Sequence, residues 1–338
     1  MSIKYIMGLD VGGTKTDCLI ADEYGHICGY AHAGSGSYEY KGVEHAYQEN
    51  EKAILAALND ANIELNDLSC IGMGVAGADI DDDYRMLDEK IYTPLFGDTP
   101  RVFLNDSFAA LRGGTEESFG LVIACGTGVI AAGISPRGEK ARAGGWLPEY
   151  GDKCTGETLG QEGLNSVWRS REGIIPETLL TQLFLDRAGL DDLDTFFYYV
   201  YTGALSTDKL QPMAQLVFRA GLEGDATACD ILREGGIYLG HMLNAVARKL
   251  SMTNESFGIS MAGSVFSEEA PILADAMKKI VRTQCPKAYF HQPMWSPIIG
   301  ALLLGFEKES PIDKSVYIQL TKSILEAEKI YKKQFKLR

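Results

Sequence analysis

The feature of this sequence that most constrains its fold is a duplicated strand–turn–strand pattern. Residues 5–33 form three short apolar segments, joined by a glycine-rich turn (VGGTKT) and a polar turn (EYGH). Residues 119–144 repeat the pattern as FGLVIA, IAAGIS and KARAG around the turns CGTGV and PRGE. The two segments share length, glycine placement and apolar phase but few identities, which is typical of a structural duplication. The pattern predicts two related domains.

The segments around the repeats alternate between strand and helix patterns. A helix is expected over 43–61, followed by strands at 70–75 and 102–104, which favours α/β layering. Beyond residue 151 the pattern is mainly helical, and one more strand is expected. The expected helices cover 156–171, 176–188, 207–220, 227–250 and 314–333, and the strand covers 258–262. With 338 residues, the chain is long enough for two cores. We expect an N-terminal domain over 1–115, a second over 116–310, and a C-terminal helix in 311–338 that packs on the body.

Composition excludes several classes of function. The formal net charge of −14 opposes a broad nucleic-acid footprint, because no long Lys/Arg run offsets the negative field. The seven cysteines are scattered without a CxxC pair, and the start of the chain lacks the apolar stretch of a signal peptide. The longest apolar run, 298–306, is too short to cross a bilayer. We therefore expect a reduced, cytoplasmic protein with neither nucleic acid nor membrane as a partner.

The glycine turns at the two repeat tips are candidate phosphate-binding loops. Gly12-Gly13-Thr14-Lys15 and Gly126-Thr127-Gly128 can point backbone amides at an anion without a basic surface. Lys15 adds a side-chain cation. Asp10, just before the first turn, suits a carboxylate that holds Mg²⁺ through water. Either loop alone could be an ordinary tight hairpin with glycine at positive φ. Two matching loops in a duplicated framework favour phosphate binding.

Two rival phosphate motifs fit less well. Gly8 and Gly13 have the spacing of a P-loop, but Thr14 stands where that motif requires lysine. The stretch 72–77, GMGVAG, matches the dinucleotide pattern GxGxxG. The residues that follow it, 79–83, carry several carboxylates where a pyrophosphate would lie, and no amphipathic helix is expected directly there. A dinucleotide site is therefore disfavoured.

Seven motifs together resemble a known family. DVGGTKTD, GVAGAD, LNDSFAAL, CGTGV, GGW, GDKCTGETLG and MAGSVF occur in the order seen in N-acetylglucosamine kinases and the wider BadF/BadG/BcrA/BcrD ATPase group, across about residues 5–306. The resemblance implies an α/β fold of two ribonuclease-H-like (actin-like ATPase) domains, with an interdomain cleft that closes on ATP and Mg²⁺. It also implies phosphate contacts from the two loops, with adenosine near Gly263 and Ser264.

The same resemblance assigns an acceptor side. Asp106, in Leu104-Asn105-Asp106-Ser107, matches the aspartate that takes the proton of the acceptor hydroxyl. A capping role for Asn105, Asp106 or Ser107 at the helix that starts there is the alternative. The substrate-binding set would be Ser37, Gly144, Gly145, Trp146 and Asp152. Trp146 could instead belong to the core, and Asp152 could cap a loop.

The implied activity is ATP-dependent phosphorylation of a hydroxyl on a small sugar, N-acetylglucosamine or a related amino sugar. Two departures blur the acceptor: Lys153 replaces a carboxylate that these kinases commonly carry, and Ser37 stands where they usually offer asparagine. A different sugar, a polyol or an anionic acceptor is therefore open. A homodimer is common in the group, and nothing in these residues marks an interface.

Two other functions remain as alternatives. GDKCTG also resembles the ATP-driven activators of 2-hydroxyacyl-CoA dehydratases, whose dimer shares an iron–sulfur cluster held by two cysteines from each subunit. Cys154 would be one ligand, but the segment that carries the second cysteine is missing here. A sensor that binds ATP and a sugar without turnover is the third hypothesis. The presence of Asp106 argues against it.

Overall fold

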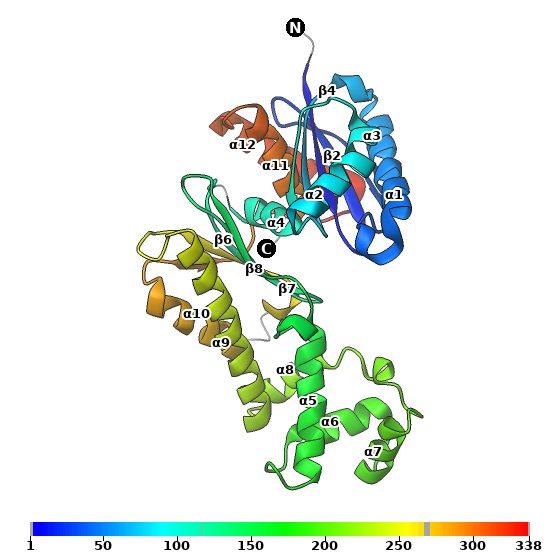
Figure 1. Ribbon diagram of the computed structural model, residues 1–338, viewed down its shortest axis with the longest axis vertical. Coiled ribbons are helices and arrows are strands. Elements are labelled where there is room, and N and C mark those ends of the chain that lie inside the picture. The colour runs from blue at the N-terminus through cyan, green and yellow to red at the C-terminus, as the bar shows by residue number, and fades with distance from the viewer. Residues whose placement is uncertain (1–2, 116, 267–270, 337–338) are drawn as a thin grey trace. The chain divides into compact units, whose positions relative to one another are not determined.

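The computed structural model describes residues 3–115, 117–266 and 271–336, and contacts divide the chain into two compact units (Figure 1). Unit 1 comprises Met1–Val122, Pro136–Gly138 and Phe290–Arg338, and unit 2 comprises Ile123–Ser135 and Glu139–Tyr289. This grouping differs from the boundaries expected at residues 115 and 310, because the segment after residue 290 packs on the N-terminal sheet. Residue 116, at the first expected boundary, lies outside the described residues.

Unit 1 is built on a five-stranded sheet in the order β3-β2-β1-β4-β5. The expected meander forms its antiparallel half, β1 (Tyr5–Val11), β2 (Thr16–Asp22) and β3 (Ile27–Ala33). β4 (Leu68–Val75) and β5 (Arg101–Asn105) run parallel to β1 and complete the sheet. The carboxyl ends of β1, β4 and β5 therefore meet at one edge, where loops can gather polar side chains.

One face of this sheet is covered by helices from the first hundred residues. The buried side chains of Met7, Leu9 and Val11 pack in one cluster with residues of α1 (Tyr38–Ala61) and of the segment after β4. That segment contains α2 (Asp81–Leu87), a π-helical turn (Asp88–Tyr92) and α3 (Thr93–Phe96). The first helix after the GxGxxG stretch, α2, begins four residues beyond Gly77, and three aspartates fill its first turn. The positive end of the helix dipole stabilises these carboxylates, and their negative charge would repel a phosphate group at that helix end.

The opposite face is covered by α4 (Asp106–Gly114), α11 (Pro297–Glu309) and α12 (Lys314–Tyr331). Glycines on the strands allow α11 to approach very closely. A Cβ atom on Gly8 would lie 2.7 Å from the backbone nitrogen of Leu302, and one on Gly72 would lie 2.1 Å from the carbonyl oxygen of Ala301. The C-terminal part of the chain thus completes the core that begins at the N-terminus.

A second five-stranded sheet, most of whose residues belong to unit 2, has the order β10-β9-β6-β7-β8. Read from β8, this order is the same as that of unit 1 read from β3, which confirms the duplication and the two-domain α/β fold. The strands are β6 (Gly120–Cys125), β7 (Val129–Ile134), β8 (Lys140–Gly144), β9 (Gly258–Ala262) and β10 (Tyr289–His291). β7 and β8 pair antiparallel, as the repeated meander requires.

Helices make up the rest of unit 2. They are α5 (Gly156–Arg171), α6 (Leu179–Ala188), α7 (Leu193–Tyr201), α8 (Ala214–Leu222), α9 (Ala226–Lys249) and α10 (Pro271–Gln284). Short 3₁₀ turns lie at Leu65–Asp67 in unit 1, and at Pro148–Tyr150, Thr207–Leu210 and Ser264–Phe266 in unit 2. Four helices of unit 2 match segments expected from periodicity, whereas α7 and α10 were not anticipated.

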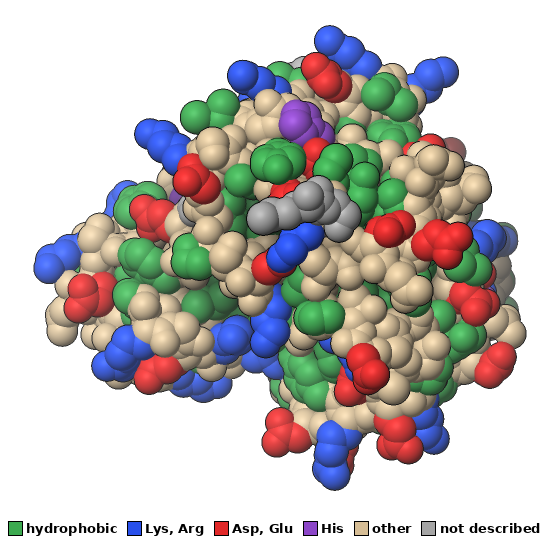
Figure 2. Space-filling view, turned by 90° about the horizontal axis from the view of Figure 1, so that it is seen from above, with side chains coloured by type: hydrophobic (Ala, Val, Ile, Leu, Met, Phe, Trp, Pro, Cys, Tyr) green, Lys and Arg blue, Asp and Glu red, His purple; other side chains and the backbone are tan. Residues whose placement is uncertain are grey.

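The surface is mixed in character. Acidic and basic side chains are interspersed with apolar and uncharged ones on the face shown in Figure 2. Within the part of the chain that the structure describes, none of the helices combines the length and hydrophobicity that a bilayer crossing requires.

Candidate functional site

The first glycine turn, between β1 and β2, is closed by a backbone hydrogen bond. The amide of Gly12 donates to the carbonyl oxygen of Lys15 at 2.9 Å. Ser35 Oγ supports the turn from outside by donating to the carbonyl oxygen of Gly12 at 3.5 Å. The side chains of Thr14 and Lys15 are exposed at the tip. The tip therefore presents a hydroxyl and an ammonium group beside backbone amides.

Two carboxylates, those of Asp10 in β1 and Asp17 in β2, flank this turn in unit 1. Asp10 and Asp17 are opposite one another in the antiparallel β1–β2 pair, so their side chains share a face. Burial, followed by the negative charges of Asp106 and Asp17, raises the pKa of Asp10 to about 7, although Lys15 and Lys333 oppose the shift. An aspartate whose charged form is disfavoured in this way is typical of a functional site.

Asp106 is the first residue of α4, directly after β5. The helix is capped by Asn105, whose Oδ1 accepts hydrogen bonds from Ser107 N at 3.1 Å and from Ser107 Oγ at 2.5 Å. Asn105 is itself anchored, because its Nδ2 donates to Asp79 Oδ1 at 2.9 Å. The cap is thus supplied by the neighbour of Asp106, and the capping interpretation of Asp106 is not required.

The second glycine turn belongs to unit 2 and borders a cavity of about 910 Å³. Gly126 N donates to the carbonyl oxygen of Gly128 at 2.9 Å, and Gly156 N donates to the carbonyl oxygen of Gly126 at 2.8 Å. The cavity is lined by Gly126, Thr127, Gly156, Glu157, Asp208, Gln211, Pro212, Ala214, Gln215, Phe218, Ser264 and Val265. Its volume lies in the range of sites for small molecules and cofactors.

Gly263 precedes Ser264, one of the residues that line this cavity. Residues that carry a side chain rarely adopt the backbone φ of 102° that Gly263 has. A Cβ atom at this position would lie 2.1 Å from the carbonyl oxygen of Cys125. Only glycine fits this position. The close approach holds Ser264 next to the loop, so that a Cβ atom on Gly126 would lie 3.5 Å from Ser264 Oγ.

The expected acceptor residues of unit 2 cluster around Asp152. Its Oδ2 accepts a 2.7 Å hydrogen bond from Trp146 N, and its Oδ1 accepts a 3.5 Å bond from the Tyr238 hydroxyl. Gly144 and Gly145 have φ values of 72° and 84°, which bend the backbone after β8. The carboxylate is 7% exposed, so Asp152 already organises the loop that carries Trp146.

Trp146 is not a core residue. Its side chain is 52% exposed, and the Arg142 guanidinium lies 5.2 Å from its ring centroid. Such an exposed aromatic face can support a ligand by stacking. Lys153, which follows Asp152 in the sequence, is also exposed, so this departure from the kinase motif adds a solvent-accessible cation.

Comparison with known proteins decides the family. The family model of the BadF/BadG/BcrA/BcrD ATPase family matches residues 7–305. The chain belongs to this family. It is 29% identical over 321 residues to the N-acetyl-D-glucosamine kinase of Dictyostelium discoideum, covering 91% of this chain and 100% of the relative.

Two further relatives agree. The N-acetylmuramic acid/N-acetylglucosamine kinase of Clostridium acetobutylicum is 26% identical over 304 residues, with coverage of 90% of this chain and 98% of the relative. The crystal structure of a ROK family glucokinase from Streptomyces griseus superposes with a TM-score of 0.53 at 19% identity, covering 90% of this chain and 100% of that one. This likeness confirms the expected sugar-kinase, actin-like ATPase fold.

Ser37 differs from the other expected substrate residues of this BadF/BadG/BcrA/BcrD family member. It is 1% exposed and caps α1 in unit 1, where its Oγ accepts a 3.4 Å hydrogen bond from Glu39 N. The hydroxyl also donates to Glu39 Oε2 at 3.4 Å. The structure thus gives this side chain a local structural role, and contact with a substrate stays a prediction.

Cys154 is placed as a buried small residue. It is 3% exposed, and Cys125 Sγ donates to its carbonyl oxygen at 2.9 Å. A Cβ atom on Gly235 would lie 2.8 Å from Cys154 Sγ, so the sulfur is packed against α9. A cluster shared between subunits needs thiolates at a surface, so this burial disfavours the activator alternative.

The sequence patterns did not identify several of the residues that line the unit 2 cavity. Asp208, Gln211, Gln215 and Phe218 come from α8 and the segment before it, and Glu157 comes from the start of α5. Glu157 lies within the GDKCTGETLG motif, whereas the other four lie outside the seven motifs and read simply as part of an amphipathic helix. Only the expected proximity of Gly263 and Ser264 to adenosine pointed toward this wall.

Proposed function

We propose that this chain is an ATP-dependent kinase that transfers the γ-phosphoryl group to a hydroxyl of a small sugar, N-acetylglucosamine or a related amino sugar. The observation that carries the proposal is the placement of Asp10, near the end of β1, and Asp106, directly after β5, at the same edge of the unit 1 sheet as the first glycine turn. A carboxylate pair at a phosphate-binding turn suits metal-assisted phosphoryl transfer to a hydroxyl. The activities for which the relatives from Dictyostelium and Clostridium are named support the same class of reaction.

The nucleotide would be held by backbone groups from both repeats. In unit 1, Gly12, Gly13, Thr14 and Lys15 would contact phosphate oxygens through amides, a hydroxyl and an ammonium group. In unit 2, Gly126, Thr127 and Gly128 would do the same with amides and a hydroxyl. Ser264, which lines the cavity of about 910 Å³, and Gly263, which precedes it, would lie beside the adenosine.

Asp10 is a fitting ligand for Mg²⁺. Its carboxylate oxygens are the hard ligands that this ion prefers, and Mg²⁺ commonly binds one or two carboxylates together with substrate phosphates. The raised pKa of Asp10, due to burial and to Asp106, reflects excess negative charge that a divalent cation would relieve. When bound, the ion neutralises charge on the phosphates of ATP.

Asp106 would act as the general base. Its carboxylate accepts the proton of the acceptor hydroxyl as the oxygen forms its bond to the γ-phosphorus and the bond from phosphorus to the β,γ-bridging oxygen breaks. The products are the sugar phosphate and ADP. The position of Asp106 at the start of α4 also lets the helix dipole stabilise its charged form before proton transfer.

The acceptor would be bound by the loop that follows β8. Asp152 would accept hydrogen bonds from sugar hydroxyls, Trp146 would stack on the ring, and Gly144 and Gly145 would allow close backbone approach. Ser37 would contribute its oxygen from unit 1. A cytoplasmic location belongs to the same proposal, because all seven cysteines are free and ATP is the donor.

A coupled assay of ADP release tests this function. Purified protein with Mg-ATP is offered N-acetylglucosamine, glucosamine, N-acetylmuramic acid, glucose and a polyol in separate reactions. We expect at least one amino sugar to raise ADP release well above the sugar-free rate, with the sugar phosphate detected by mass spectrometry. ADP release that never exceeds the sugar-free rate with any acceptor would refute the kinase.

A further inference from the structure

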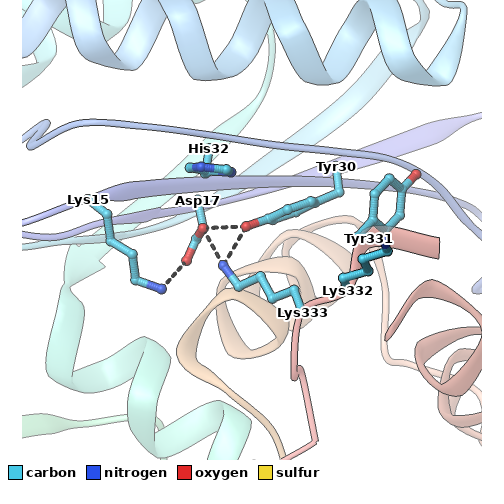
Figure 3. A pocket seen from close by; sticks show the side chains of 7 residues that line it. All are labelled: Lys15, Asp17, Tyr30, His32, Tyr331, Lys332 and Lys333. Atoms are coloured by element: carbon cyan, nitrogen blue, oxygen red, sulfur yellow. Dashed lines mark hydrogen bonds and ion pairs between the residues drawn. The ribbon is translucent and has the colours of Figure 1, made fainter. Parts of the chain in front are cut away.

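The Asp17 carboxylate in unit 1 collects donors from three parts of the chain (Figure 3). Lys15 Nζ donates to Asp17 Oδ2 at 2.8 Å, and the Tyr30 hydroxyl donates to Oδ1 at 2.7 Å. Lys333 Nζ forms an ion pair with the same Oδ1 and donates to the Tyr30 oxygen at 2.5 Å. Lys333 follows α12 and is separated from Asp17 by more than three hundred residues of sequence.

The two lysines differ in exposure. The side chain of Lys15 is 57% exposed and can extend from the turn toward a ligand, whereas that of Lys333 is 20% exposed. The carboxylate that both contact is 2% exposed. A carboxylate so deeply buried requires a cation beside it. Lys333 can supply that cation from within the fold, because its side chain is mostly buried beside the carboxylate.

The charges of this cluster decide what Lys15 can do. With both lysines protonated, the cluster with Asp17 has a net charge of +1, and the excess charge lies on the exposed Lys15. Without Lys333, Lys15 and Asp17 would form a neutral pair, and Asp17 would retain the Lys15 ammonium group. We propose that Lys333 is a positioning residue for the glycine turn: it neutralises Asp17 and leaves the charge of Lys15 available to a phosphate group.

The chain around Lys333 is built to hold it there. Lys332 has a φ of 51°, which turns the backbone sharply at the end of α12. Phe335 is fully buried, its amide donates to Glu328 Oε1 at 2.7 Å, and its carbonyl oxygen accepts a 2.7 Å bond from Ser296 N. Lys333 Nζ also lies 4.7 Å from the centroid of the Tyr30 ring. Both ends of this short segment are therefore anchored.

The pKa values of the two ammonium groups are shifted in opposite directions. Burial lowers the pKa of Lys333, and the hydrogen bond to Asp17 offsets only part of that effect. Burial also acts to lower the pKa of Lys15, but the hydrogen bond to Asp17 and the charge of Asp17 outweigh it, so the pKa of Lys15 is raised. Lys333 is thus the desolvated member of the pair.

This inference rests on the proposed function, because the phosphate group belongs to ATP. ADP affinity, measured by titration calorimetry, tests it in Lys333→Met and Lys333→Arg. We expect Lys333→Met to weaken ADP binding about tenfold, the value of one charge-assisted hydrogen bond, while Lys333→Arg keeps it near the wild-type value. Lys329→Met, which removes one exposed charge from the last turn of α12, is the matched control. An unchanged ADP affinity in Lys333→Met would overturn the proposal.

A double-mutant cycle separates this role from general structural support. If Lys333 acts through Lys15, adding Lys333→Met to Lys15→Met changes ADP affinity by less than about twofold. A further tenfold loss in that background would contradict the proposal. Asp17→Asn combined with Lys333→Met restores a net charge of +1, so this pair is expected to bind ADP as the wild type does. This double variant also tests the proposal if Lys333→Met alone fails to fold. Tenfold weaker ADP binding by the double variant would contradict the proposal.

A measurement without nucleotide distinguishes failure of this inference from failure of the proposed function. The rate at which acetic anhydride modifies Lys15, followed by peptide mass spectrometry, reports the fraction of its amine that is unprotonated. We expect this rate to fall several-fold in Lys333→Met, because Asp17 is then paired with Lys15 alone. An equal rate in both proteins would overturn the role of Lys333. If the wild type binds no ADP, nucleotide binding is refuted. If the rate is nevertheless lower in Lys333→Met than in the wild type, the coupling between Lys333 and Lys15 is still established.

Discussion

Asp106, in the first turn of α4, repels Asp10 at the end of β1. After burial, this charge is the largest cause that raises the pKa of Asp10 to about 7. Two carboxylates that disfavour each other's ionisation are stable together only where a cation or a proton resolves the conflict. The proposed kinase would use both solutions, with Mg²⁺ at Asp10 and an incoming proton at Asp106.

Asp106→Asn is expected to abolish sugar phosphorylation and spare nucleotide binding. The amide cannot accept the proton of the acceptor hydroxyl, so kcat should fall by about 10²- to 10⁴-fold. ADP affinity, measured by calorimetry, should change by less than about threefold. Asp98→Asn, an exposed aspartate before β5, is the control. Turnover near the wild-type rate in Asp106→Asn would remove Asp106 from the mechanism.

Asp10 should make the protein less stable as pH rises. Its pKa is about 7 in the folded chain and about 4 in an unfolded one, so the folded state binds more protons between these values. The stability present below about pH 4 is therefore lost progressively up to about pH 7. Asp10→Asn removes this penalty and should raise the free energy of unfolding at about pH 8 by up to about 4 kcal/mol, with little change at about pH 4.

Urea denaturation at the two pH values, without Mg²⁺, measures this effect. The exposed Asp98→Asn again provides the comparison. A free energy of unfolding that is equal for wild type and Asp10→Asn at both pH values would show that Asp10 ionises normally. Added Mg²⁺ should stabilise the wild type more than Asp10→Asn at the higher pH, because only the wild type offers it the carboxylate.

Gly72→Ala tests how tightly α11 presses on the sheet of unit 1. The new Cβ atom would lie 2.1 Å from the carbonyl oxygen of Ala301 and 2.3 Å from the amide nitrogen of Gly305. Neither backbone atom can move without shifting the helix, so we expect a loss of about 2–4 kcal/mol in unfolding free energy. Gly156→Ala, whose Cβ atom would be 3.6 Å from its nearest neighbour, should change stability by less than about 1 kcal/mol. Equal thermal midpoints for the two variants would contradict the packing described.

Trp146→Ala should affect substrate binding and not stability. Because the side chain is 52% exposed, its loss should cost less than about 1 kcal/mol of unfolding free energy. Removal of the stacking surface should raise the KM for the sugar about tenfold with the KM for ATP unchanged. Tyr201→Ala, at an 80% exposed aromatic residue of α7, controls for loss of a surface ring. An unchanged sugar KM in Trp146→Ala would exclude Trp146 from the acceptor site.

The parts of this molecule that depend on local pattern were predictable from the sequence. The meander at 5–33 has alternating apolar residues and turn glycines, and both repeats formed the expected strands. α5 and β9 formed at the residues expected from their periodicity, because their patterns are long or bounded by clear turns. Asp10 was chosen because it ends a strand pattern before a glycine turn, whereas Asp106 was assigned by the resemblance to the kinase family, and the roles of both stay predictions.

The parts that depend on contacts distant in sequence were not predictable. Lys333 appears in the sequence as one of several lysines at the end of a helix, and nothing local indicates that it reaches Asp17. The compact units differ from the grouping expected with a boundary at 310 for a related reason, since the strand glycines that admit α11 carry no signal of which helix will pack on them. Hydrophobic periodicity specifies that a face will be buried, but not by which segment.

The chain order of unit 1 has a consequence for synthesis of the protein. Its sheet comes from the first 105 residues, whereas α11 and α12, which cover one face, come after residue 296. During translation the N-terminal sheet therefore leaves the ribosome with Ile6, Leu19 and Ala21 still uncovered, until unit 2 has been made in full. A nascent chain halted at residue 290 contains all of unit 2, but unit 1 still lacks its C-terminal segment. The apolar surface left exposed on unit 1 makes such a chain a substrate for chaperones that bind apolar surface.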